Sequence, residues 1–236
     1  MSRKPSGSLV GGAGSRGGGP SRPSAVARGT AYELAVRSYL LSSPYNCTSL
    51  IRIGGAGDAG VDLRGRWGGT PVLPFLGAKE MEDEEAVRRA QRWSVVVQCK
   101  AYAKQVGPAV VRELEGVLSA EEQVLLSMLR RPSEAPPSSP NSSPSSSSLP
   151  AVPPPTFGFL FSLSGFSTAA CVRAFASKLP LSLCHLRPRD PGALDDAARK
   201  GSKRGVLQPE ELEVLSMSFN NTTRRILQET MKGKEP

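Results

Sequence analysis

The chain has 236 residues, which is enough for one domain with a substantial core, and its 24 glycines and 21 prolines concentrate near the N-terminus and in one internal tract. Its formal net charge of +9 favours a polyanionic partner, because phosphates attract lysine and arginine. The apolar runs are too short for a helix that crosses a bilayer, so we expect no membrane insertion. The four cysteines are too far apart for a zinc ribbon or a disulfide framework.

The N-terminal segment, residues 1–28, contains arginine, lysine and serine but no acidic residue. This charge pattern is typical of a mitochondrial transit peptide. Its high glycine content opposes the amphipathic helix that such a peptide forms, so an ordinary disordered tail is the alternative. We predict that residues 1–28 are a transit or disordered segment.

The middle of the chain alternates between helical and strand patterns. The order is a helix at 30–41, strands at 49–53, 61–66 and 93–100, a helix at 107–129, a strand at 157–163, a helix at 168–179 and a strand at 181–186. The strand at 93–100 is apolar on both faces over most of its length, as a central strand should be. This order predicts an α/β fold, a mixed β-sheet covered by helices.

Segments of different composition interrupt or follow this pattern. Residues 67–92 are irregular and charged, and residues 132–155 are nearly all serine and proline, which cannot bury enough apolar surface to become ordered. We predict a folded domain over 29–190 with a disordered loop inserted at 132–155. Residues 191–236 are predicted to form a charged, helical C-terminal extension.

Polar residues on two neighbouring strands form a candidate site. Residues two apart in a strand share a face, so Gln98 and Lys100 point together and Cys99 points away. Asp62 lies between apolar residues in the strand at 61–66. If these strands pair, a carboxylate, an amide oxygen and an ammonium group converge. Such a set suits phosphodiester hydrolysis, in which a hard cation activates water and a lysine offsets the developing charge.

Two motifs make a family resemblance specific. The runs GGAGDAGVDL at 54–63 and VQCK at 97–100 resemble the GG-x-GD-x-GVD and QCK signatures of Mrr-like nucleases of the PD-(D/E)XK superfamily. The run RGTAYE at 28–33 resembles the leading helix of that family. With GFLFS at 158–162 and the serine-rich loop, the pattern is also similar to fungal mitochondrial proteins required for respiratory growth, a branch of that fold.

This resemblance implies a restriction-endonuclease-like fold and DNA cleavage with Mg²⁺ or Mn²⁺. Asp62 would hold the metal, Gln98 and the Cys99 carbonyl would complete its shell, Lys100 would assist the attacking water, and Glu33 would approach from the leading helix. The resemblance makes the mitochondrion the expected location and DNA the expected partner, with RNA second and a homodimer as one expected form. Gln98 replaces the acid of the broader superfamily and weakens dication affinity. The alternative is therefore a catalytically inactive nucleic-acid-binding or assembly factor on the same fold.

Structural interpretations compete with these roles. Asp62 alone is a typical strand-edge carboxylate, Lys100 a typical charge at a strand end, and Glu33 a typical acid in the first turns of a helix. His185 is expected to be structural. The glycines at 55–60 also satisfy GxGxxG, but a dinucleotide site needs a helix directly afterwards, and the sequence there predicts a strand.

The N-terminal segment is tested by deletion. A tagged full-length protein is expected to enter mitochondria and to be shortened near Arg28, because residues 1–28 have the charge pattern of a transit peptide. Fluorescence microscopy and mass spectrometry of the mature N-terminus measure both. An unchanged distribution after deletion of residues 1–28 contradicts the targeting role.

Overall fold

A computed structural model describes residues 22–42, 45, 47–54, 60–67, 93–130, 154–201 and 204–231. The predicted N-terminal segment up to residue 21, the charged insertion at 68–92 and the serine- and proline-rich tract at 131–153 lie outside the described residues. No helix within these ranges is long and apolar enough to cross a membrane.

The described residues form a six-stranded sheet in which the strands lie side by side in chain order. The strands are β1 (Thr48–Arg52), β2 (Leu63–Arg66), β3 (Ser94–Lys100), β4 (Thr156–Ser162), β5 (Leu181–Pro188) and β6 (Leu212–Phe219). The central strands β3, β4 and β5 run parallel, and the outer pairs are antiparallel. Since the central strands are covered on both faces, most of their residues are apolar and buried. The predicted mixed α/β sheet is confirmed.

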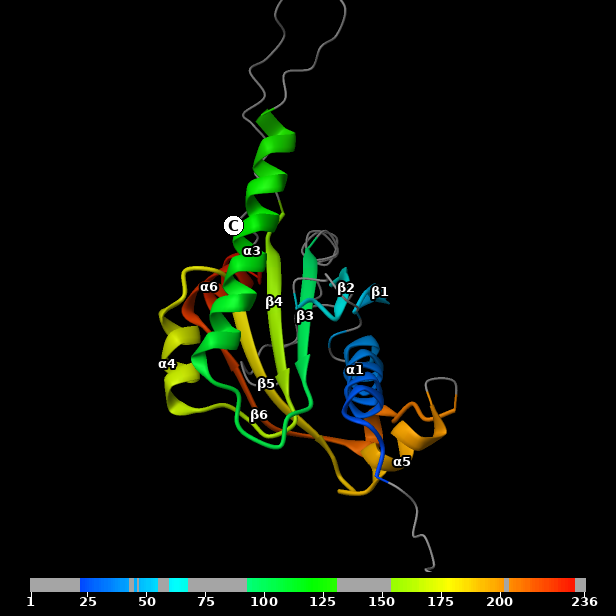
Figure 1. Cartoon of the computed structure of the whole chain (residues 1–236). Coiled ribbons are helices and arrows are strands. Elements are labelled where there is room, and N and C mark those ends of the chain that lie inside the picture. Colours follow the sequence, from blue (N-terminus) through cyan, green and yellow to red (C-terminus); the bar gives the residue numbers. More distant parts are fainter. Residues whose placement is uncertain are drawn as a thin grey trace, which may run out of the picture.

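Helices cover both faces of the sheet (Figure 1). Helix α1 (Ala25–Leu41) and helix α5 (Ala193–Lys200) pack together on one side, and helices α3 (Pro108–Arg130) and α4 (Thr168–Ala176) pack on the other. A short 3₁₀ helix, η1 (Pro209–Glu211), precedes β6, and helix α6 (Asn221–Met231) contacts β5 and β6.

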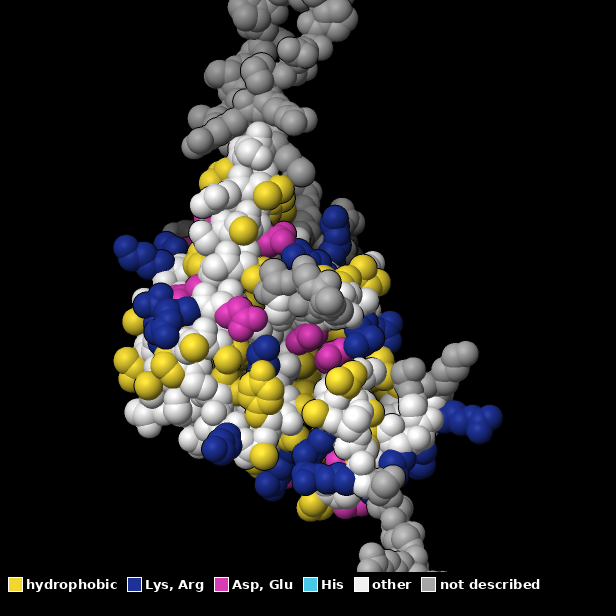
Figure 2. All heavy atoms as spheres, in the orientation of Figure 1, with side chains coloured by type: hydrophobic (Ala, Val, Ile, Leu, Met, Phe, Trp, Pro, Cys, Tyr) yellow, Lys and Arg dark blue, Asp and Glu magenta, His cyan; other side chains and the backbone are white. Residues whose placement is uncertain are grey.

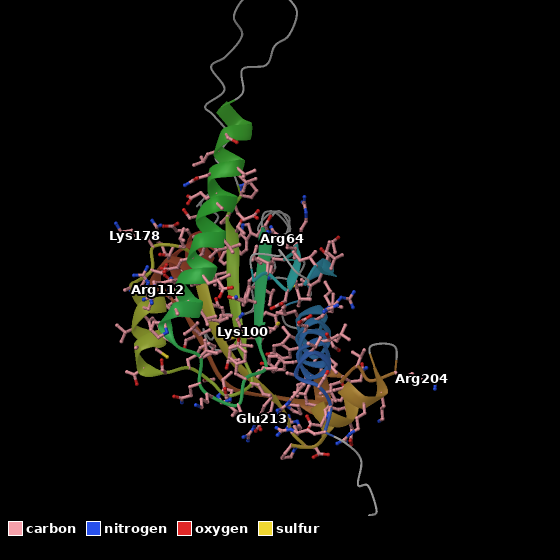
Figure 3. The ribbon with its side chains drawn as sticks, viewed as in Figure 1. Arg64, Lys100, Arg112, Lys178, Arg204 and Glu213 are labelled. Carbon is pink, nitrogen blue, oxygen red and sulfur yellow. The ribbon has the colours of Figure 1, made fainter. Side chains whose placement is uncertain are left out.

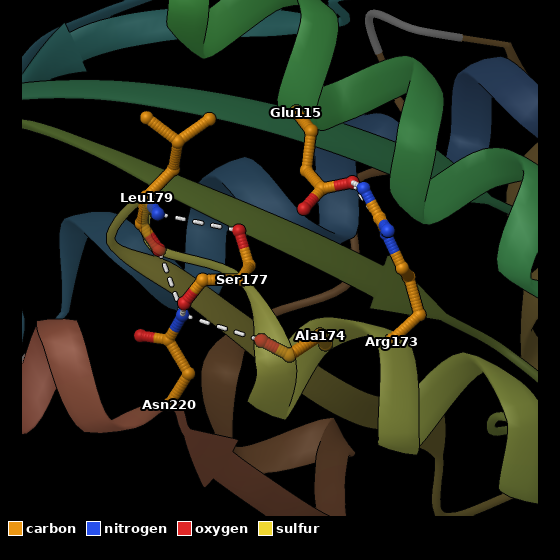
Figure 4. Close-up of polar contacts among 6 residues, drawn as sticks. All are labelled: Glu115, Arg173, Ala174, Ser177, Leu179 and Asn220. Atoms are coloured by element: carbon orange, nitrogen blue, oxygen red, sulfur yellow. Dashed lines mark hydrogen bonds and ion pairs between the residues drawn. The ribbon is translucent and has the colours of Figure 1, made fainter.

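Two polar contacts attach the helices across long distances in the sequence. The hydroxyl of Tyr32 on α1 donates to the carbonyl of Leu186 on β5 at 2.9 Å, inside the core. Glu115 on α3 pairs with Arg173 on α4 at 2.6 Å (Figure 4). Both contacts fix the position of a helix that contributes to the candidate site.

The N-terminal helix begins at Ala25 rather than near residue 30. Ser24 caps it, because its hydroxyl accepts a hydrogen bond from the Ala27 N–H at 3.1 Å. The first turn is largely exposed and Val26 faces solvent, so the apolar periodicity starts only at Ala31. This turn lies inside the segment predicted to be a transit or disordered stretch.

Residues 191–231 contain the helices α5 and α6, but they also contain strand β6, which the predicted helical extension did not include. Strand β6 pairs antiparallel with β5, and Leu212, Phe219 and Leu227 are buried in the main core. The segment therefore completes the sheet. The sequence pattern fails here because β6 is an edge strand whose burial does not alternate regularly, and a bulge at His185 shifts its register.

Asn220 joins three elements at the end of β6 (Figure 4). Its side-chain oxygen accepts from the Thr223 N–H at 2.9 Å, which caps the first turn of α6. Its amide nitrogen lies within hydrogen-bonding distance of three backbone carbonyls, those of Ala174 (3.3 Å), Ser177 (3.2 Å) and Leu179 (2.7 Å). A single buried amide thus satisfies both the end of α4 and the start of α6.

Substitution of this residue should destabilise the whole domain. We expect Asn220→Ala to lower the free energy of unfolding by about 2–3 kcal/mol, because it removes a helix cap and leaves buried carbonyls without a donor. Chemical denaturation followed by circular dichroism measures the change. The neighbouring exposed residue supplies the control, and Asn221→Ala should shift stability by no more than about 0.5 kcal/mol. Equal stability of the two variants would contradict the joining role.

Candidate functional site

The pairing of β2 with β3 places Asp62 beside the end of the central strand. The Asp62 N–H donates to the carbonyl of Val97 at 2.9 Å, which continues the antiparallel ladder one residue before β2 begins. The Asp62 carboxylate in turn accepts a hydrogen bond from the Cys99 N–H at 2.6 Å. A charge-assisted bond to a backbone donor holds this carboxylate in one orientation.

Gln98, the residue before Cys99 on β3, is buried and only 1% exposed. Neither its side-chain oxygen nor its side-chain nitrogen has a hydrogen-bond partner among the described residues. A buried amide in this state costs about 1–3 kcal/mol, so its retention needs an explanation other than stability. Such a group is suited to bind a ligand that supplies the missing partner.

Glu113 on α3 meets Gln98 at Gly60. Gly60 has a φ of +79°, and a Cβ there would lie 2.1 Å from Glu113 Oε1 and 2.6 Å from Gln98 Nε2. The bare backbone of residue 60 therefore lets a carboxylate and the buried amide approach from two elements. This arrangement places an acidic side chain close to the Gln98 amide.

The sequence motifs do not indicate that Glu113 lies at the site. The available signal was its position in the second turn of the helix that follows Lys100, next to the buried residues Val111 and Leu114. A helical pattern shows which face is apolar, but it does not show which strand end the neighbouring face overlooks.

Glu33 lies on the other side of Asp62. A Cβ on Gly54 would lie 3.4 Å from Glu33 Oε2 and 3.5 Å from Asp62 Oδ1, so the two carboxylates flank this glycine. Glu33 also forms an ion pair with Arg52, which donates a further hydrogen bond to Thr30 at 3.3 Å. The structure therefore places Glu33 near Asp62, and the ion pair with Arg52 offsets the negative charge of Glu33.

Lys100 ends β3 on the same face as Gln98, because residues two apart in a strand share a face. Figure 3 shows it in the space between α3 and α1. Its ammonium nitrogen lies 5.9 Å from the centroid of the Tyr102 ring, within the range of a cation–π contact.

Cys99 points away from this face and packs against the core beneath α1. Burial raises the pKa of the Cys99 thiol well above its ordinary value, the charges of Asp62 and Glu33 raise it further, and Lys100 lowers it. The thiol therefore stays protonated near neutral pH and is no nucleophile. The backbone N–H of Cys99, which orients Asp62, is its observed contribution to the site.

The donor set decides which metal the site suits. Within the described ranges, no group of three acidic, histidine or cysteine side chains is placed to hold an ion. The available donors are carboxylate oxygens of Asp62, Glu113 and Glu33 and the amide of Gln98. Mg²⁺ typically takes one or two carboxylates and completes its shell with waters and phosphate oxygens. These oxygen donors are of the kind that Mg²⁺ or Mn²⁺ prefers, but the described residues do not gather three of the acidic side chains into one group.

Figure 2 shows charges of both signs on this face. Acidic side chains gather between α3 and α1, and lysine and arginine side chains surround the start of α1. The same surface therefore presents groups for a cation and groups for an anion, as a site for a metal and a phosphate would require.

The remaining features have structural roles. Trp67 and Trp93 are buried and pack edge to face at 6.1 Å. His185 Nε2 lies 3.3 Å from the carbonyl of Leu163, and its ring packs against Gly165. Strand β2, rather than a helix, follows Gly60, so the dinucleotide interpretation lacks the structure that it requires.

The described residues form a mixed α/β sheet flanked by helices, in which Asp62 and Glu33 lie near the end of a central strand that carries Lys100. Residues 24–133 match the model of the family described as Required for respiratory growth protein 7. The chain is 30% identical over 167 residues to an uncharacterized mitochondrial protein of Schizosaccharomyces pombe, covering 71% of this chain and 47% of that protein. It is 31% identical over 132 residues to the mitochondrial Required for respiratory growth protein 7 of Candida glabrata, covering 45% and 52%.

These similarities concern the cellular location of the protein and the share of its relatives that the chain matches. Both relatives are mitochondrial proteins, and the predicted mitochondrial localisation is thereby confirmed. The chain spans about half the length of these relatives. No solved structure matches the chain.

The glycine at position 60 offers a test of the site's geometry. We expect Gly60→Ala to lower the free energy of unfolding by about 1–2 kcal/mol, because a φ of +79° strains any residue with a Cβ. The same substitution at Gly116, where a Cβ on helix α3 would meet nothing within 4 Å, should instead raise stability by about 0.5–1 kcal/mol.

The Gly60 substitution also allows the contact with Glu113 to be measured. A double variant, Gly60→Ala with Glu113→Ala, should be less destabilised than the two separate effects predict, since removal of the carboxylate makes room for the added methyl group. Denaturant unfolding of the four proteins of this cycle gives the coupling. Strictly additive effects would show that Glu113 does not approach Gly60.

Proposed function

We propose that this chain is a mitochondrial metal-dependent nuclease of the PD-(D/E)XK type, which hydrolyses phosphodiester bonds in DNA. The observation that carries the proposal is that the Cys99 N–H orients the Asp62 carboxylate at the end of β3, the strand that also carries the buried Gln98 amide, which has no partner among the described residues. The parallel central strands, the antiparallel strands before them and the helices on both faces support a restriction-endonuclease-like fold.

In this proposal each side chain has a separate role. Asp62, Gln98 and the Cys99 carbonyl would hold Mg²⁺ or Mn²⁺, and Glu113 and Glu33 would add negative charge around it. The bound cation would lower the pKa of a water and polarise a phosphoryl oxygen. Lys100 would orient the attacking water or offset the charge that develops on the phosphate.

The biological role follows from the relatives. The family is described by its requirement for respiratory growth, and we extend that role to this chain. A nuclease in mitochondria would act on the mitochondrial genome, whose maintenance respiration needs. The net charge of +9 favours such a polyanionic substrate over a small neutral one.

One feature of the site favours a second function. Gln98 occupies the position at which the broader superfamily has an acid, and Glu33 already pairs with Arg52. Both reduce the negative charge available to a dication. A nucleic-acid-binding or assembly factor that has kept the fold without turnover is therefore the alternative.

Purified protein with Mg²⁺ or Mn²⁺ tests the proposal. We expect cleavage of DNA, and we expect Asp62→Asn and Lys100→Met to slow it by roughly a hundred-fold or more, because each removes a group that acts on the scissile phosphate. Lys178→Met is the matched control, since this exposed lysine lies beyond α3 from Lys100 in Figure 3. Unfolding curves show whether each variant keeps its fold.

Gln98→Glu makes the test sharper. It returns the acid of the broader superfamily and should lower the concentration of Mg²⁺ or Mn²⁺ needed for half-maximal cleavage. If the wild-type protein and this variant are both inert with every divalent ion, and the wild type still binds nucleic acid, the binding factor is the correct function.

A further inference from the structure

A cavity of about 410 Å³ lies between the start of α1 and the end of β3. Among the residues that the structure describes, the charged ones that line it are all cationic, namely Arg22, Arg28 and Lys100, and none is acidic. Lys100 belongs to both this cavity and the candidate site described above. The cavity therefore forms a positively charged extension of that site.

The start of α1 adds to the positive potential of this cavity. Its first turn contains no acidic residue, and the N-terminus of a 17-residue helix carries a partial positive charge. Arg28 Nε lies 3.2 Å from the Asp195 carboxylate on α5, which holds this side chain in place and offsets part of its charge. Arg22, which lies three residues before α1 begins, is exposed. An anion that enters the cavity meets cations from two elements.

Tyr102 gives the cavity a second kind of contact. Tyr102 is 54% exposed, lies two residues after the end of β3, and has its ring centroid 5.9 Å from the ammonium nitrogen of Lys100. An exposed aromatic ring beside several cations is the combination that binds a nucleotide, since the ring stacks on the base and the cations contact its phosphate.

From this juxtaposition we propose that the cavity binds one phosphate of a nucleic-acid strand, with the adjoining unpaired base stacked on Tyr102. The phosphate contacts Arg22, Arg28 and Lys100. This inference rests on the proposed function, because it assigns the substrate a path across the same face. A phosphate held here fixes the register of the strand relative to Asp62 and Gln98.

The phosphate has two sources in a strand, an internal diester or a terminal monoester. A monoester carries the larger charge, and the three cations of the cavity suit it better. Fluorescent single-stranded oligonucleotides with a 5′-phosphate, a 3′-phosphate or two hydroxyl ends distinguish these sources. Their affinities are measured by anisotropy with the full chain in EDTA, so that binding is observed without cleavage.

Variants then locate the binding. Arg22→Ala should weaken binding roughly ten-fold and reduce the salt dependence by about one ion, because it removes one phosphate contact. Tyr102→Ala should weaken it about five- to ten-fold, whereas Tyr102→Phe, which keeps the ring, should bind like the wild type. Arg204→Ala is the control, since this exposed arginine points away from the ribbon in Figure 3 and does not line the cavity.

The outcomes separate this inference from the proposed nuclease activity. Loss of affinity with Arg22→Ala and Tyr102→Ala supports the cavity, and it does so even if no divalent ion yields cleavage. A 5′- or 3′-phosphate that tightens binding only when Arg22 is present identifies a terminal phosphate, and equal affinity for all ends identifies an internal one. Affinity that is unchanged in both Arg22→Ala and Tyr102→Ala overturns the cavity while leaving the nuclease proposal intact.

Discussion

The register between β2 and β3 is the constraint on which the candidate site depends. Leu63 lies opposite Val97, so the preceding Asp62 reaches the Cys99 N–H with its carboxylate. A slip of one residue would turn every side chain of a strand to the opposite face and separate Asp62 from the end of β3. The conformation of Gly60, with its φ of +79°, directs the chain into this register and leaves space beside Gln98.

The packing of α3 on the sheet places the carboxylate of Glu113 close to Gln98 of β3. The buried side chains of Leu114 and Leu118 pack α3 against the sheet. A Cβ on Gly158 of β4 would lie 2.6 Å from the Leu118 side chain, so the helix packs closely over β4. Close packing of the apolar face of α3 fixes the rotation of the helix about its axis. The side chain of Glu113, which neighbours this apolar face, is thereby placed close to Gln98. The core and the site are therefore coupled, since a change in helix packing would move a carboxylate at the site.

Charge changes sign over a short distance on this face. The Glu113 carboxylate lies near the buried Gln98 amide, and the carboxylates of Glu33 and Asp62 flank Gly54. Cations, including Lys100, line the adjoining cavity. A uniformly acidic surface would repel a phosphate backbone, and a uniformly basic one would repel a dication. Here the two signs of charge lie on neighbouring elements near one strand end.

The sequence by itself determined the local features of this protein. Strand alternation placed Gln98 and Lys100 on one face, and the glycine run with Asp62 and the apolar strand after it indicated a mixed sheet with a polar site at its edge. The tertiary structure alone decided that residues 212–219 complete the sheet, that Glu113 meets Gln98, and that the exposed start of α1 forms a cationic cavity with the end of β3. The physical reason is that periodicity records which face of an element is buried, whereas pairing and packing between distant segments decide which polar groups meet.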